Sequence, residues 1–136
     1  MKSRKSFIWI AALLVAFFAG AIGWSNIQQE GAHRHFTQQL QVRNPNNTGP
    51  VKRAYLVSCD SLAWDAMQSY GNLQPHNKYG HTTVYFFLSD QPIPQLLELG
   101  ANPFPREFYS LCVARYQKLA QGQVRFERYP FERGAQ

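Results

Sequence analysis

The sequence lacks the motifs that most directly identify a reaction. It contains no phosphate-binding glycine loop, no G-x-S-x-G nucleophile elbow and no H-E-x-x-H zinc helix. It also lacks an internal repeat and a low-complexity tract. These absences exclude the enzyme classes that such motifs define, so the function has to be sought in the location of the chain, its fold and a few side chains.

Charged residues are absent from Phe7 to Trp24, an apolar run of 18 residues. A helix of this length would reach about 27 Å, slightly less than a hydrocarbon core of about 30 Å. Lys2, Arg4 and Lys5 precede the run, without an acidic residue. Because positive charge resists translocation, we expect residues 1–6 to form a cytoplasmic basic flank and the chain after the run to cross the membrane.

The apolar run has features of both a retained anchor and a cleaved signal peptide. Ala19-Gly20-Ala21 places small residues where signal peptidase requires them. The run continues past that point, however, and Trp9 and Trp24 lie near its two ends, where an indole favours the membrane interface. We predict a single-pass signal anchor over residues 7–24 in a bacterial inner membrane. A secreted or periplasmic product after cleavage near Ala21 is the alternative.

Concentrated positive charge is scarce beyond the leader. The chain carries a formal charge of +6, and three of its 14 basic residues precede the apolar run, which leaves 11 basic and 8 acidic residues from Ser25 onward. No basic run is longer than Lys52-Arg53. Nucleic-acid-binding proteins usually concentrate their basic residues. We therefore expect the membrane and other envelope proteins as partners, and no nucleic acid.

The chain has only two cysteines, Cys59 and Cys112. Two cysteines in an oxidising compartment allow one intramolecular pairing. They are 53 positions apart, and the chain-entropy model assigns a loop of that length about 4 kcal/mol of stabilisation. We expect a Cys59–Cys112 disulfide, with two separate buried thiols as the alternative.

Hydrophobic periodicity predicts one small domain over residues 36–136, joined to the apolar run by a polar tether over residues 25–35. Alternating apolar residues and β-rich composition predict four strands. They cover residues 36–43, 51–59, 81–89 and 124–129. The third, "HTTVYFFLS", is apolar on one face and amphipathic on the other, so we expect it to be central and covered on both faces.

Helical patterns occupy the remaining segments. A short helix should follow Cys59, with Asp60 as its cap and Gly71 at its end. A brief helical segment is predicted within residues 90–100, and the main helix over residues 102–122, capped by Asn102. The order β-β-α-β-α-α-β predicts an α+β fold, in which helices cover one side of a mainly antiparallel sheet.

The four histidines do not stand at spacings typical of a metal site. His33 and His35 flank Arg34 in the tether, and His76 and His81 bracket the loop sequence "NKYG". A metal ion needs three or four ligands in fixed geometry, and no cysteine or carboxylate lies at a matching short spacing. We interpret these residues as solvated loop histidines and expect neither a metal nor another cofactor.

Cys59 and His81 form the one candidate catalytic pair. A thiol at a predicted helix N-terminus and an imidazole on a neighbouring strand are the arrangement of papain-like hydrolases. The segments "SCDSLAWDAM" and "GHTTVYFF" resemble the Cys and His segments of the NlpC/P60 cell-wall peptidases. The resemblance implies Cys59 as nucleophile and His81 as general base. The chain departs from that family in lacking a glycine-containing surround of the cysteine, and a disulfide at Cys59 would exclude this role.

Three functional hypotheses follow from these observations. We favour a non-enzymatic, single-pass inner-membrane protein whose periplasmic domain is an interaction module of a secretion-type or conjugation-type envelope assembly. The first alternative is the Cys–His cell-wall hydrolase. The second is a secreted binding, inhibitor or immunity protein. The C-terminal "YPFERGAQ" could dock on a partner or fold back on its own domain, and the sequence leaves both open.

Overall fold

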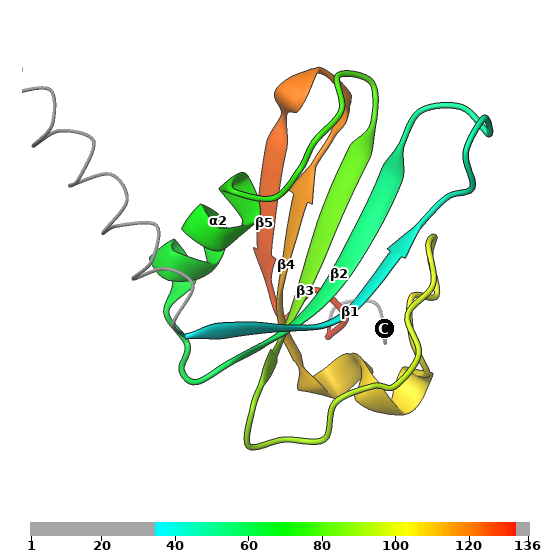
Figure 1. Ribbon diagram of the computed structural model, residues 1–136. Coiled ribbons are helices and arrows are strands. Elements are labelled where there is room, and N and C mark those ends of the chain that lie inside the picture. The colour runs from blue at the N-terminus through cyan, green and yellow to red at the C-terminus, as the bar shows by residue number, and fades with distance from the viewer. Residues whose placement is uncertain (1–34, 133–136) are drawn as a thin grey trace, which may run out of the picture. The chain divides into compact units, whose positions relative to one another are not determined.

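Five strands form one mixed sheet in the computed structural model, which describes residues 35–132 (Figure 1). They lie side by side in chain order: β1 (Phe36–Arg43), β2 (Lys52–Cys59), β3 (His81–Leu88), β4 (Cys112–Lys118) and β5 (Val124–Arg128). β2 and β3 are parallel, and the other three neighbouring pairs are antiparallel. The described domain is therefore a small α+β domain, as the sequence predicted.

The predicted basic flank, the predicted anchor and all but the last residue of the predicted tether lie outside the described residues. Within residues 35–132, no helix is long and apolar enough to cross a membrane.

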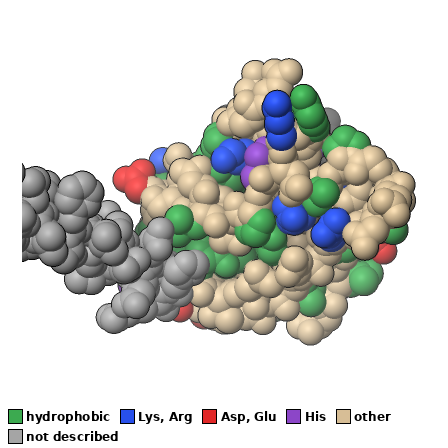
Figure 2. All heavy atoms as spheres, turned by 45° about the horizontal axis from the view of Figure 1, so that its top comes forward, with side chains coloured by type: hydrophobic (Ala, Val, Ile, Leu, Met, Phe, Trp, Pro, Cys, Tyr) green, Lys and Arg blue, Asp and Glu red, His purple; other side chains and the backbone are tan. Residues whose placement is uncertain are grey.

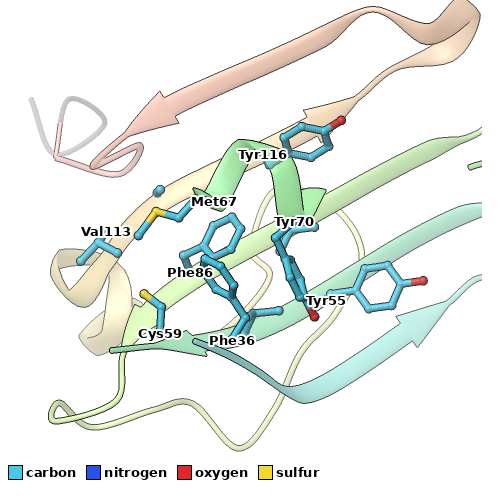
Figure 3. Packing of buried hydrophobic residues seen from close by; sticks show 11 residues of the cluster. Phe36, Tyr55, Cys59, Met67, Tyr70, Phe86, Val113 and Tyr116 are labelled. Atoms are coloured by element: carbon cyan, nitrogen blue, oxygen red, sulfur yellow. The ribbon is translucent and has the colours of Figure 1, made fainter. Parts of the chain in front are cut away.

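The helix α2 (Trp64–Asn72) connects β2 to β3 and covers one side of the sheet, which we name the helix face (Figure 1). Parallel neighbours need such a crossover because a tight turn cannot return the chain to the same end of the sheet. Met67 and Tyr70 of α2 pack on the buried side chains of the helix face (Figure 3). These are Phe36, Tyr55, Val57, Cys59, Val84, Phe86, Val113, Ala114 and Tyr116.

The predicted ends of this helix need correction. The helix begins at Trp64, and its N-cap, Ala63, makes no side-chain capping bond. Asp60 instead lies 3.5 Å from His35 Nδ1 and accepts a hydrogen bond from Ser89 Oγ. Gly71 lies within the last turn rather than beyond it, because its missing side chain leaves space for the Tyr116 ring.

The opposite side of the sheet, which we name the loop face, is covered by the chain between β3 and β4 (Figure 1). Phe104 from this segment lies edge-on to Tyr85 and Phe87, at ring-centroid distances of 5.3 and 5.2 Å. Leu97 is buried in the same cluster. The sheet is thus covered on both faces, by one α-helix and by a mostly irregular segment, whereas we had predicted helices on one side.

The central position of β3 confirms the strongest strand prediction. Val84 and Phe86 point to the helix face, Tyr85 and Phe87 point to the loop face, and all four are at most 5% exposed. Such burial on both faces explains why this strand reads as nearly continuous apolar sequence.

The predicted main helix over residues 102–122 is wrong. A six-residue 3-10 helix, η1 (Arg106–Leu111), leads into strand β4, and a second short one, η2 (Ala120–Gly122), follows it. β4 pairs with β3 on one side and β5 on the other, so tertiary pairing overrides the helical spacing of its apolar residues. The predicted helical segment within residues 90–100 is also absent, and Pro92 and Pro94 there have no N–H to donate.

A bulge in β1 changes which face its side chains occupy. The register with β2 shifts between Gln38 and Leu40. As a result Phe36 joins the helix-face cluster, whereas Leu40 and Val42 pack against the loop-face cluster. The predicted strand is confirmed, but the bulge interrupts the alternation of faces that a regular strand would show.

The described part of the C-terminal segment folds back on the domain. The Phe131 ring stacks on Tyr109 at a centroid distance of 4.4 Å and meets Phe104 edge-on. The backbone N–H of Tyr129 donates to the Val113 carbonyl at 2.9 Å. Tyr129 and Phe131 therefore pack against the two core clusters, which decides between the two alternatives for this part of the tail.

Gly71→Ala tests the contact between α2 and β4. A methyl group at this position would lie inside van der Waals contact of the Tyr116 ring, which is fully buried. Alanine would gain up to about 1 kcal/mol of helix propensity, but overpacking a rigid ring typically costs about 1–3 kcal/mol. We expect a net destabilisation in urea unfolding of the full chain, whereas Ser69→Ala on the exposed side of α2 should change stability little. An equal or higher stability of Gly71→Ala would contradict this packing.

Candidate functional site

The predicted disulfide is not present: Cys59 and Cys112 are both free and buried. Cys59 ends β2 and Cys112 begins β4, with β3 between them. Two strand spacings separate the cysteines by about 10 Å, whereas disulfides need Cα atoms within about 7 Å. The thiols also belong to the clusters on opposite faces of the sheet. The alternative of two separate buried thiols describes the structure.

The structure does not bring Cys59 and His81 together. In the parallel register, Cys59 pairs with Leu88, and His81 pairs with Lys52 at the other end of the same strands. Seven residues of extended chain separate these positions by about 23 Å. Burial, with the nearby Asp60 carboxylate adding to it, raises the pKa of the Cys59 thiol to about 11. A protonated thiol inside the helix-face core cannot act as the nucleophile of a Cys–His pair.

Both thiols should be unreactive in the folded protein. Burial raises the pKa of Cys112 to about 12, and each Sγ lies 3.4 Å from a backbone carbonyl oxygen. We expect Ellman's reagent at about pH 8 to react with neither thiol in the native full chain, and with both after denaturation without a reductant. Fast reaction of Cys59 in the native protein, or no free thiol after denaturation, would contradict the structure.

The remaining candidate groups for metal binding or acid–base catalysis are dispersed. Within residues 35–132, no three His, Cys, Asp or Glu side chains gather closely enough to hold a metal ion. His33 lies outside the described residues, and His35 contacts Asp60. Asp65 is an exposed residue in the first turn of α2.

Six cationic side chains converge at one end of the sheet, where β2 and β3 begin. We name this surface the basic end. It consists of Arg43, Lys52, Arg53, Lys78, Lys118 and Arg125. One rung of the sheet places Arg43, Arg53, Thr82 and Lys118 side by side. Figure 2 shows Lys, Arg and His side chains gathered on the end of the molecule that is uppermost in Figure 1. The sheet register therefore assembles a basic surface from residues up to 82 positions apart in sequence.

None of these six cations has a carboxylate oxygen within 4 Å among the described residues. Arg43 Nη2 donates to Asn46 Oδ1 at 3.0 Å, and Arg53 Nη1 donates to Asn77 Oδ1 at 2.6 Å. Neutral amides thus orient the two guanidinium groups without cancelling their charge. Arg43 and Arg53 also lie directly opposite each other, an arrangement that costs stability. The basic end therefore retains a net positive field toward solvent.

Acidic residues lie at the other end of the sheet. Asp60 directly follows β2, Asp90 lies two residues after the end of β3, and Glu107 lies in η1 just before β4. Phe36, the first residue of β1, pairs with Cys59 at this same end. This acidic end also carries Arg106 and Arg128, so it lacks the excess of positive charge that the basic end has, and the chain enters the domain there.

A cleft of about 260 Å³ opens on the loop face of the basic end. Strand residues supply one wall, and residues 98–100 of the covering segment supply the other. Lys52 and His81 lie at its rim as a register pair of β2 and β3. Burial raises the pKa of the lining residue Tyr85 to about 12, although Arg115 opposes the shift, so its phenol stays neutral at physiological pH. The cleft therefore combines exposed cations with a neutral, partly apolar interior.

The pKa of His76 responds to the positive charges on the helix-face side of the basic end. Its Nδ1 lies 3.3 Å from the hydroxyl oxygen of Thr82. Loss of solvent lowers the pKa of this imidazole, and the nearby Lys118, His81 and Arg53 lower it further, against an opposing hydrogen bond with the Leu119 backbone. The neutral imidazole is therefore the form that the folded domain favours.

This shift predicts a pH dependence of stability. Because the folded-state pKa of His76 lies below the unfolded value of 6.5, the unfolded chain binds the proton more readily, and stability falls as the pH drops through and below that value. We expect the free energy of unfolding of the full chain to decrease between about pH 8 and pH 5, and His76→Gln to make this decrease smaller. An equally steep decrease in the variant would show that His76 does not contribute.

Comparison with known proteins adds no assignment to these observations. The basic end could not be predicted from the sequence, because its cations are dispersed along the chain and only the strand register brings them together. No family model, no curated protein and no solved structure matches the chain.

Proposed function

We propose that this protein is a single-pass inner-membrane protein whose domain outside the cytoplasm is an interaction module of a cell-envelope assembly, of the secretion or conjugation type. The N-terminal apolar run and its basic flank support the anchored topology. The cysteines no longer support an oxidising compartment, since they are free thiols. The location therefore rests on the N-terminal segment alone.

The observation that carries the interaction role is the basic end with its six cations without a carboxylate partner in the described domain. Uncompensated like charge destabilises a fold, but it steers and orients a partner of opposite charge. The eight-residue strand β1 extends from the acidic end, where the chain enters the domain, toward the basic end. Its length places the basic end about 25 Å from that point, so the surface can face a partner away from the site of attachment.

The two alternative functions differ in their support. The Cys–His hydrolase required a pair that the fold separates to opposite ends of two parallel strands. The secreted binding protein shares the same basic end and differs only in cleavage near Ala21. A mature N-terminus at Ile22 would favour that alternative over the anchored protein.

Site-specific photocrosslinking in intact cells tests the interaction role. Gln123 and Gln91 are a matched pair of exposed glutamines, at the basic end and the acidic end respectively. With a photoreactive amino acid at each position in turn, we expect position 123 to yield an adduct with one envelope protein and position 91 to yield far less. Lys52→Glu should weaken the adduct at 123, because it reverses a charge of the surface. Mass spectrometry of the purified adducts identifies the partner.

A reporter fused to the C-terminus provides the compartment control. Alkaline phosphatase should be active there, since it folds only in an oxidising compartment. Equal crosslinking from both positions would contradict a role for the basic end, and a reporter active only in the cytosol would contradict the location.

A further inference from the structure

We propose that the cleft at the basic end receives an acidic side chain from an extended segment of the partner protein. This inference rests on the proposed function, because it names the chemistry of the partner at the same surface. The alternatives of a nucleic acid and of general charge attraction are outcomes of the test below.

Two side chains at the rim are placed to hold a single carboxylate. Lys52 and His81 are a register pair of the parallel strands β2 and β3, so their backbones lie about 4.8 Å apart. Both side chains are exposed, and both line the cleft. Lys52 Nζ and an imidazole N–H can donate to the two oxygens of one carboxylate. A cleft of about 260 Å³ is of the size of one side chain rather than of a folded element.

The opposite wall argues for a peptide rather than a nucleic acid. Glu98 lines the cleft across from the strand residues, and it lies among the cations without forming a salt bridge within the described residues. A nucleic-acid backbone carries a charged phosphate at every nucleotide and has no N–H group to donate to Glu98. A peptide instead offers backbone N–H groups, which can donate to the Glu98 carboxylate while its own acidic side chain contacts Lys52.

The cleft is formed by well-packed elements on both sides. The Glu98 N–H donates to the Pro103 carbonyl at 2.7 Å, which closes the turn that carries Glu98. Leu97 and Phe104, on the two sides of that turn, are 8% and 4% exposed in the loop-face core. Gly100 has a φ of +106°, a conformation that favours glycine. Because the wall is already held in place, binding needs little ordering of the protein.

The neutral interior suits the aliphatic part of an acidic side chain. Leu99 and Tyr85 both line the cleft. Methylene groups of a glutamate would contact them while the carboxylate remains near Lys52 and His81 at the rim. Glutamate should therefore bind better than aspartate, whose carboxylate is one methylene closer to its backbone.

Fluorescence anisotropy with the full chain in nanodiscs tests the inference. The probes are a fluorescein-labelled dodecapeptide of alternating serine and glutamate, and a labelled oligothymidylate of equal net charge. We expect the peptide to bind at least about tenfold more tightly than the oligonucleotide. Lys52→Glu should weaken peptide binding about tenfold or more, whereas Arg106→Glu, the same charge change at an exposed position near the acidic end, should weaken it less than about twofold.

Glu98→Gln provides the second variant. Removing this carboxylate should raise the affinity for oligothymidylate more than the affinity for the peptide. The ratio of the two affinities should therefore become smaller. Thermal unfolding verifies that all variants are folded. Equal effects of Lys52→Glu and Arg106→Glu would overturn the cleft as the site. Oligothymidylate binding as tight as peptide binding, or a ratio unchanged in Glu98→Gln, would overturn the peptide assignment.

The inference and the proposed function can fail separately. If position 123 crosslinks to an envelope protein but the acidic peptide does not bind the folded chain, the interaction role stands and the acidic-segment inference is wrong. If the peptide binds but no adduct forms in cells, the cleft chemistry stands and the proposed role in an envelope assembly is wrong.

Discussion

The parallel pairing of β2 with β3 is the constraint on which the rest of this domain depends. Parallel neighbours begin at the same end of a sheet, so the pairing places Lys52 beside His81 and, at the other end, Cys59 beside Leu88. The same pairing requires a crossover, and α2 supplies it while burying the helix face. One register therefore builds the rim of the cleft and separates the two residues that the sequence suggested as a catalytic pair.

Aromatic contacts and one ion pair hold the loop face of this sheet together. Aromatic rings from three separate segments, Tyr85, Phe104 and Phe131, meet on the loop face, so the covering segment is held without an α-helix. Edge-to-face and stacked rings of this kind contribute about 0.5–1.5 kcal/mol each beyond their buried area. Across the loop face, Arg115 and Glu127 pair at 2.9 Å between β4 and β5. The charge of Arg115 is thus neutralised between the strands, whereas the cations of the basic end face solvent.

The sequence predicted local structure well where one pattern had a single interpretation. Strands β1, β2, β3 and β5 followed from alternation or from a short apolar run, and α2 followed from helical spacing. The prediction of β4 failed because the spacing of Cys112, Val113 and Tyr116 also fits one face of a helix. Only the pairing with β3 and β5 makes this segment a strand. The bulge in β1 similarly depends on the register with β2, which no local pattern specifies. The disulfide prediction relied on cysteine count and expected compartment, and these do not say that a third strand lies between the two residues.

The candidate site could not be predicted for a related reason. From sequence, the positive charge beyond the leader is dispersed, which we took as evidence only against nucleic-acid binding. Strand order and register turn that dispersion into a cluster, because Arg43 ends one strand, Lys52 and Arg53 begin the next, and Lys118 ends a third. Turns that connect neighbouring strands bring such terminal residues to one end of a sheet, so charge should be judged by position within strands and not by spacing along the chain. Asp60, Asp90 and Glu107 lie at the opposite end, so the excess positive charge of the described domain is at the basic end, which supports the proposal of an anionic partner there.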